Sequence, residues 1–214
     1  MTAPVRALLI DIDGTLVDSN YQHVVAWYDA FHRNGYRDVT GASIHRSLGL
    51  AGPDLISHLV GNEDERVADR HDELLREMCD QIEAIPGAPE LLQRAGEAGL
   101  AVVLVTSAGE QDLEWMLPLL GTGRDAVTTL ITSDDIDDSK PDPQPFLLAA
   151  EKAGVPVAEC VVIGDSVWDM KAAARGGFRA IGLTCGGTSA AELTDAGADE
   201  VYDGPADIEL SALS

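Results

Sequence analysis

The stretch Asp11-Ile12-Asp13-Gly14-Thr15 follows directly after the apolar run Ala7-Leu8-Leu9-Ile10, and this junction decides the fold. A short run in which every residue is apolar is typical of a strand that is buried on both faces of a parallel sheet. Similar runs recur, and we expect strands at residues 7–10, 101–105, 127–132, 161–163, 180–183 and 200–202. Segments with helical periodicity lie between them at 88–98, 110–120, 143–153 and 169–175. Strands that alternate with helices predict an α/β fold, a Rossmann-like, doubly wound parallel sheet with helices on both faces.

The segment from Asn20 to Glu83 interrupts this alternation, because it contains no convincing strand. Helical patterns cover residues 21–34, 41–48, 53–60 and 64–83. We therefore expect two domains: an α/β core formed by residues 1–19 and 84–214, and an inserted α-helical cap formed by residues 20–83. The expected hinges are residues 17–20 and 84–88, and the second of these is rich in Pro and Gly.

Composition and charge exclude several classes of partner. The 214 residues carry a formal net charge of −23, so nucleic acid and anionic membrane surfaces would repel this protein. No apolar stretch approaches the roughly 20 residues that cross a bilayer. The three cysteines lack the spacing of a zinc site or of a disulfide framework. We expect a cytoplasmic protein, and the sequence leaves open whether it is a monomer or a homodimer.

Polar residues follow the ends of the predicted strands, and ligand sites in open parallel sheets form at that edge. These residues are Asp11 and Asp13 after the first strand, Thr106 and Ser107 after the second, Lys140 after the third, and Asp165 and Asp169 after the fourth. Carboxylates that lie close together raise one another's pKa unless a cation intervenes. Oxygen ligands without His or Cys favour Mg²⁺, and a lysine can hold a phosphate. An Asp can attack phosphorus to form an aspartyl-phosphate, so the pattern predicts Mg²⁺-dependent phosphoryl transfer.

Four segments resemble, in order, the four motifs of the haloacid dehalogenase superfamily. They are residues 11–19, 102–106, 139–143 and 162–169. The helical insert also lies at the position of the family's cap. Within the superfamily, the chain is most similar to the phosphoglycolate phosphatase and β-phosphoglucomutase-like group.

The resemblance implies a role for each residue of the motifs. Asp11 would attack phosphorus, and Asp13 would protonate the leaving oxygen and then activate water. Mg²⁺ would bind the carboxylates of Asp11 and Asp165 and the backbone carbonyl of Asp13. Asp169 would act from behind these ligands or fix the position of Lys140.

The remaining implied roles concern the substrate, a small phosphorylated metabolite. Thr106 and Lys140 would hold the phosphoryl oxygens, and backbone N–H groups, among them those of Ser107 and Ala108, would add donors. The expected substrate is a phosphate monoester of the phosphoglycolate or sugar-phosphate type.

Two residues of the insert are candidates for contact with the substrate. His23 lies one helical turn past the first hinge, and Arg46 precedes the segment Leu48-Gly49-Leu50. Each has a plainer alternative: His23 can pack against neighbouring helices, and Arg46 can lie on a solvated helix surface.

Residue types discriminate among the reactions of the superfamily. Asp13 argues against dehalogenation, which needs no acid two residues after the nucleophile. The insert contains no lysine, which argues against the Schiff-base chemistry of phosphonoacetaldehyde hydrolases. A phosphomutase stays an alternative, although Ala51-Gly52-Pro53 offers no base where β-phosphoglucomutases carry an Arg, unless Arg46 substitutes for it. A catalytically silent phosphate-binding module is the other alternative.

Overall fold

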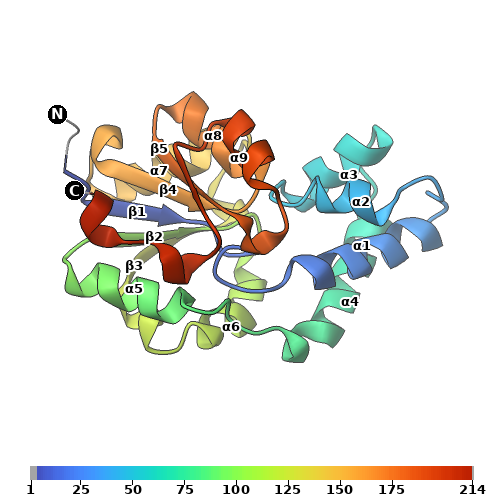
Figure 1. Ribbon diagram of the computed structural model, residues 1–214. Coiled ribbons are helices and arrows are strands. Elements are labelled where there is room, and N and C mark those ends of the chain that lie inside the picture. The colour runs from blue at the N-terminus through green and yellow to red at the C-terminus, as the bar shows by residue number, and fades with distance from the viewer. Residues whose placement is uncertain (1–3, 214) are drawn as a thin grey trace.

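In the computed structural model, which describes residues 4–213, six strands form one parallel sheet in the order β3-β2-β1-β4-β5-β6 (Figure 1). All neighbouring strands run parallel to each other. The strands are β1 (Ala7–Ile10), β2 (Ala101–Val105), β3 (Val127–Ile131), β4 (Cys160–Gly164), β5 (Arg179–Leu183) and β6 (Glu200–Tyr202). The predicted doubly wound α/β architecture is confirmed.

Helices cover both faces of this sheet (Figure 1). One face is covered by α7 (Gln144–Ala153), α8 (Val167–Gly176) and α9 (Ala190–Ala196), and the other by α5 (Ala88–Glu97) and α6 (Glu110–Leu119). Strand β1 is apolar at every position because it contributes to both interfaces. Leu8 and Ile10 belong to the hydrophobic cluster on the side of α5, whereas Leu9 packs in the cluster that contains Phe146 of α7. Successive side chains of a strand point to opposite faces, so a strand between two layers of helices has no solvent face.

Four further helices lie beyond the carboxyl ends of the strands: α1 (Asn20–Arg33), α2 (Gly41–His45), α3 (Gly52–Val60) and α4 (Glu65–Met78) (Figure 1). They share a third hydrophobic cluster, in which Trp27 and Phe31 of α1 pack with Leu55 and Ile56 of α3. We refer to these four helices as the cap helices. No helix in the part of the chain that the structure describes is long and apolar enough to cross a membrane.

The two segments that connect the cap helices to the sheet run side by side. Val17 and Ala84 form an antiparallel bridge, and the amide of Asp18 donates to the carbonyl of Glu83 at 2.9 Å. The domain boundaries at residues 20 and 83 stay a prediction, and they fall at this crossing.

Most predicted elements agree with the structure to within two residues, and the differences lie at helix ends. The helix predicted over 169–175 already begins at Val167, because the hydroxyl of Ser166 caps it. The helix predicted over 41–48 ends at His45, and the chain then turns back toward the sheet through Gly49, whose φ is +98°. Helix α9 was not predicted.

Candidate active site

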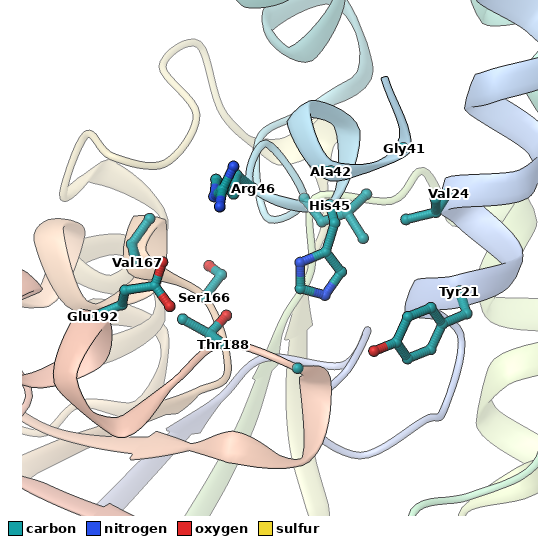
Figure 2. Close-up of a pocket in the computed structure, with 12 residues that line it drawn as sticks. Tyr21, Val24, Gly41, Ala42, His45, Arg46, Ser166, Val167, Thr188 and Glu192 are labelled. Atoms are coloured by element: carbon teal, nitrogen blue, oxygen red, sulfur yellow. The ribbon is translucent and has the colours of Figure 1, made fainter. Parts of the chain in front are cut away.

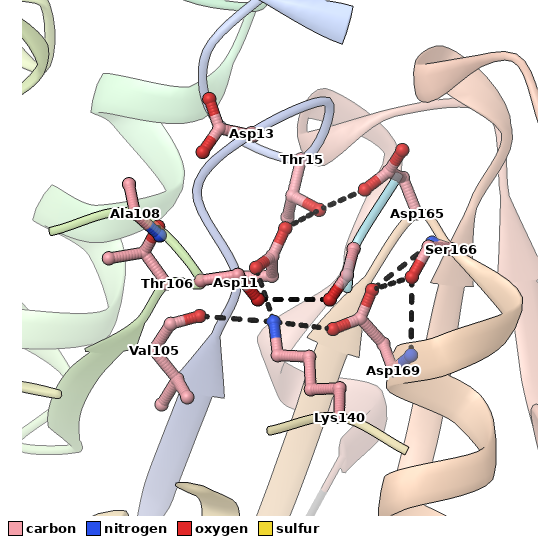
Figure 3. Close-up of polar contacts among 12 residues, drawn as sticks. Asp11, Asp13, Thr15, Val105, Thr106, Ala108, Lys140, Asp165, Ser166 and Asp169 are labelled. Atoms are coloured by element: carbon pink, nitrogen blue, oxygen red, sulfur yellow. Dashed lines mark hydrogen bonds and ion pairs between the residues drawn. The ribbon is translucent and has the colours of Figure 1, made fainter. Parts of the chain in front are cut away.

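The carboxylates of Asp11, Asp165 and Asp169 form one buried group with the ammonium of Lys140 at the carboxyl edge of the sheet (Figure 3). One oxygen of each carboxylate lies within 4.8 Å of the others. Lys140 Nζ lies 2.5 Å from Asp11 Oδ1 and 2.8 Å from Asp169 Oδ1. All four side chains are almost completely buried. The group thus holds three carboxylates and one ammonium, which contacts only Asp11 and Asp169, so negative charge is in excess.

The order of the strands brings these residues together. Strands β1 and β4 are neighbours in register Ile10↔Ile163, so Asp11 and Asp165 emerge side by side. The turn after β1 depends on Gly14, which has a φ of +74°. A Cβ at this position would overlap the carboxylate of Asp165, so the approach of the turn to the carboxylate requires glycine.

Local hydrogen bonds orient the two carboxylates that follow β4. Asp165 Oδ1 accepts from the hydroxyl of Thr15 at 3.0 Å, and Asp165 Oδ2 accepts from the amide of Asn20 at 2.8 Å. Asp169 Oδ2 accepts from the hydroxyl of Ser166 at 2.5 Å, within the box that caps α8. Asp169 therefore reaches both the start of its own helix and Lys140.

Burial and neighbouring charges shift the pKa values of Asp11, Asp165 and Lys140. Burial raises the pKa of Asp11, and the nearby Asp169 and Asp165 add to the rise, which the attraction of Lys140 only partly offsets. Burial and the charge of Asp169 raise the pKa of Asp165 to about 7. Although burial opposes it, the attraction of Asp11 and Asp169 raises the pKa of Lys140. The raised pKa values of Asp11 and Asp165 and the raised pKa of Lys140 are consistent with one another, because a single ammonium cannot neutralise three carboxylates.

The group fits a hard divalent cation such as Mg²⁺. Its ligand atoms are carboxylate oxygens, and its excess of negative charge is the feature that a cation would remove. Asp11 and Asp165 would hold the ion, while Asp169 already faces Lys140.

Asp13 points away from Lys140 (Figure 3). It lines a cavity of about 390 Å³. Asp13 Oδ1 lies 2.5 Å from the donating hydroxyl of Ser19 and 3.2 Å from His23 Nε2. Although burial favours the neutral acid, the hydrogen bond to His23 lowers the pKa of Asp13. The same contact raises the pKa of His23 against the effect of burial. Two carboxyl groups only two residues apart in sequence therefore sit in different surroundings.

The end of β2 carries three of the residues that the sequence predicts to contact the phosphate: Thr106, Ser107 and Ala108. Thr106 is buried, and its Oγ1 accepts from the amide of Ala108 at 3.0 Å. The hydroxyl of Ser107 donates to the carbonyl of Gly49 at 2.9 Å and so ties the cap helices to the core. Ser107 and Ala108 line the same cavity as Asp11 and Asp13.

The two candidates among the cap helices lie in different places. His23 lines the cavity of Asp11 and Asp13. Arg46 lines a separate cavity of about 490 Å³, together with His45, Ser166 and Thr188 (Figure 2). The structure therefore brings His23 to the predicted active site and places Arg46 outside it.

Further residues at the site were not singled out from the sequence. Thr15 and Asn20 bind Asp165, and His71 and Asp72 of α4 line the cavity. Thr15 belongs to the first motif, which signals its position. His71 carries no such signal, because its neighbour His23 lies 48 residues earlier in the chain.

Comparison with known proteins gives consistent results. A family model described as haloacid dehalogenase-like hydrolase matches residues 5–177. A phosphoglycolate phosphatase of Xylella fastidiosa is 32% identical over 182 residues, which cover 81% of this chain and 77% of that protein. A validoxylamine A 7'-phosphate phosphatase of Streptomyces hygroscopicus subsp. limoneus is 30% identical over 194 residues, which cover 84% and 85% of the two chains.

A solved structure described as a hydrolase from Pseudomonas syringae superposes with a TM-score of 0.88 at 37% identity, over 94% of this chain and 95% of that one. The similarity therefore extends over sequence, fold and the cap helices. This protein belongs to the haloacid dehalogenase-like hydrolases.

Proposed function

We propose that this protein is a Mg²⁺-dependent phosphatase that hydrolyses a small phosphate monoester through an aspartyl-phosphate on Asp11. The observation that carries the proposal is the position of Asp11. Its carboxylate contacts buried Lys140 and also lines the cavity, while Asp13 lies on the same wall. The names of the two phosphatase relatives support the same activity.

The residues can divide the reaction into two steps. Asp11 forms a bond to phosphorus as the bond between phosphorus and the leaving oxygen breaks, and Asp13 gives that oxygen a proton. Asp13 then takes a proton from a water molecule, whose oxygen attacks phosphorus and releases inorganic phosphate from Asp11. Lys140 and Thr106 hold the phosphoryl oxygens, and bound Mg²⁺ supplies further positive charge beside them.

The cavity wall favours a leaving group without negative charge. Asp72, Glu110, Asp112 and Asp134 line it, and burial together with neighbouring carboxylates raises the pKa of Asp112. Among the described residues that line the cavity, Arg76 is the one arginine or lysine, and its side chain is exposed. A hydroxyl-rich leaving group, as in a sugar phosphate, therefore suits the cavity better than the carboxylate of phosphoglycolate.

The same charge distribution disfavours a phosphomutase, which must also hold a second phosphate.

The proposal is tested by the release of inorganic phosphate from a panel of aryl, sugar and carboxylate-bearing phosphates, with Mg²⁺ and with EDTA. We expect Mg²⁺-dependent turnover that is highest for sugar-type substrates and is lost in Asp11→Asn. A wild-type protein that releases phosphate from no member of the panel would contradict the proposal and favour a silent binding module.

The nucleophile is tested separately by trapping with beryllium fluoride. We expect tight, Mg²⁺-dependent binding of the fluoride complex to the wild type and none to Asp11→Asn. Equal binding to both proteins would remove Asp11 from its proposed role.

A further inference from the structure

A continuous chain of hydrogen bonds leads from Asp13 through two histidines to the protein surface. Asp13 Oδ1 lies 3.2 Å from His23 Nε2, and His23 Nδ1 lies 3.0 Å from His71 Nε2. His71 Nδ1 lies 2.8 Å from Asp72 Oδ1. The chain starts after β1, crosses α1 at His23 and ends on α4, where the Asp72 side chain is 57% exposed. Helices α1 and α4 therefore meet through a polar contact behind the predicted acid–base residue.

The partners in this chain of hydrogen bonds determine which nitrogen of each histidine donates. The exposed carboxylate of Asp72 can only accept, so His71 Nδ1 carries the proton of that bond. His71 is buried, and burial lowers its pKa to about 4 although Asp72 opposes the shift, so the ring is neutral at pH 7. The Nε2 atom of a neutral ring protonated at Nδ1 accepts, which requires His23 Nδ1 to donate.

The last link of the chain joins His23 to Asp13. His23 Nε2 and Asp13 Oδ1 would face each other with lone pairs if neither carried a proton, and such a contact would be repulsive at 3.2 Å. The two contacts therefore fix the orientation of the His23 ring, with Nδ1 toward His71 and Nε2 toward Asp13. In the proposed reaction Asp13 gives a proton to the leaving oxygen and takes one from water, so the orientation of His23 beside it bears on both steps.

Packing fixes the ring of His71. The ring of Trp27 stacks on it with centroids 3.7 Å apart and an interplanar angle of 12°. His71 is 6% exposed, and Trp27 is 4% exposed. The ring can therefore neither flip toward solvent nor tilt without separating this stack.

We propose that His71, held by Asp72 and Trp27, is a positioning residue: it accepts from His23 Nδ1 and so holds His23 Nε2 against the carboxyl group of Asp13. The inference rests on the proposed function, since it assigns His71 a part in leaving-group protonation. We therefore expect replacement of His71 to lower kcat/KM most for substrates whose leaving oxygen is a poor leaving group. An aryl oxide leaves readily without a proton, whereas an alkoxide does not.

The test compares kcat/KM for p-nitrophenyl phosphate with kcat/KM for β-glycerophosphate or, if the wild type is slow on it, the best alkyl phosphate of the panel. The comparison uses full-length enzyme with Mg²⁺. His71→Phe keeps a ring against Trp27 but loses both nitrogens, and His71→Gln keeps an amide oxygen that can accept from His23 Nδ1. We expect His71→Phe to lower kcat/KM for the alkyl phosphate about 10-fold or more beyond any loss in kcat/KM for p-nitrophenyl phosphate. This decrease is a fraction of the rate enhancement that general acid catalysis contributes. His71→Gln should restore the wild-type ratio of the two values to within about 3-fold.

Control variants separate this role from a structural one. His58→Phe makes the same change on α3, outside the cavity, and should leave the ratio unchanged. Asp72→Ala changes an exposed residue and should shift the ratio in the same direction as His71→Phe, which keeps the inference testable if His71→Phe does not fold.

Equal losses on both substrates in His71→Phe, or no loss with either, would overturn the positioning role while leaving the phosphatase proposal intact. If His71→Phe does not fold, an unchanged ratio in Asp72→Ala overturns it. A wild type inactive on both substrates would overturn the proposed function itself.

Discussion

Replacing Lys140 with Met removes the ammonium that Asp11 and Asp169 share and leaves an apolar side chain of similar length in its place. Lys140 is 1% exposed, so water cannot take over the role of the ammonium. In the metal-free variant, three buried carboxylates would remain with their oxygens within 4.8 Å of one another. We expect a large loss of stability in the absence of Mg²⁺, because the charges can then be relieved only by protonation or unfolding.

The distances set the scale of this loss. At an effective dielectric constant of about 20, opposite unit charges at 2.5 Å and 2.8 Å attract each other by about 7 and 6 kcal/mol. The cost of burying the ammonium offsets much of this gross attraction. Removing one partner of a buried ion pair costs about 3 to 5 kcal/mol in the free energy of unfolding, and we expect a loss in this range.

The loss should depend on pH in a defined direction. The folded-state pKa of Asp11 already lies above the unfolded value, and removal of Lys140 raises it further. Between the unfolded and folded values the folded protein binds more protons, so its stability falls as pH rises. The difference between wild type and Lys140→Met should therefore be larger at pH 8 than at pH 5.

Urea unfolding, followed by circular dichroism at both pH values with EDTA or with Mg²⁺, measures these differences. Lys152→Met is the matched control, because Lys152 pairs with Asp135 at 3.0 Å but is 37% exposed, and its loss should cost less than about 1 kcal/mol. Mg²⁺ should recover more stability in Lys140→Met than in the wild type. A metal-free Lys140→Met protein as stable as Lys152→Met at pH 8 would refute the claim that the carboxylates depend on this ammonium.

Two further predictions concern the metal and the contact between cap helices and core. Because the pKa of Asp165 is about 7 in the metal-free protein, protons compete with Mg²⁺ for its carboxylate. Calorimetry should show that the affinity for Mg²⁺ falls up to about tenfold per pH unit below pH 7. An affinity for Mg²⁺ that does not change between pH 5.5 and pH 8 would contradict this prediction. Gly49→Ala should lower kcat, because Gly49 has a φ of +98° and its new methyl group would overlap the Ser166 hydroxyl and lie 3.3 Å from the Trp168 ring. Gly61→Ala is its control, because φ is +83° there but the space around it is open. Both variants should lose about 1 kcal/mol of stability to backbone strain, whereas only Gly49→Ala should lose turnover. Equal turnover in the two variants would refute the claim that this contact between the cap helices and the core supports catalysis.

The core of the site was predictable from local signals. A fully apolar run indicates a buried parallel strand, and such strands end at a common edge. Asp11, Lys140 and Asp165 could therefore be assigned to one place without knowledge of the strand order. The neighbouring strands β1 and β4 then bring Asp11 beside Asp165, whereas Lys140 reaches Asp11 from the loop that follows β3, the second strand from β1.

The sequence predicts the cap helices, but it does not predict which of their side chains face the active site. Both His23 and Arg46 are candidate substrate contacts from the sequence, yet of these two only His23 lines the cavity of Asp13. Which way a side chain of a short helix points depends on how that helix packs, and a periodic pattern does not contain this information. For the same reason, the contacts of Ser107 with Gly49 and of His71 with His23 were not foreseen.

The α/β core, the helical insert and the residues of the buried carboxylate group follow from the amino-acid sequence alone, since each gives a periodic pattern or a motif at the end of a strand. The packing of the folded chain sets which carboxylates contact Lys140 and which line the cavity, and it connects Asp13 through His23 and His71 to the surface. Burial and secondary structure leave a pattern along the chain, whereas a shared cavity depends on the packing of helices α1 and α4, whose contacting residues are far apart in sequence.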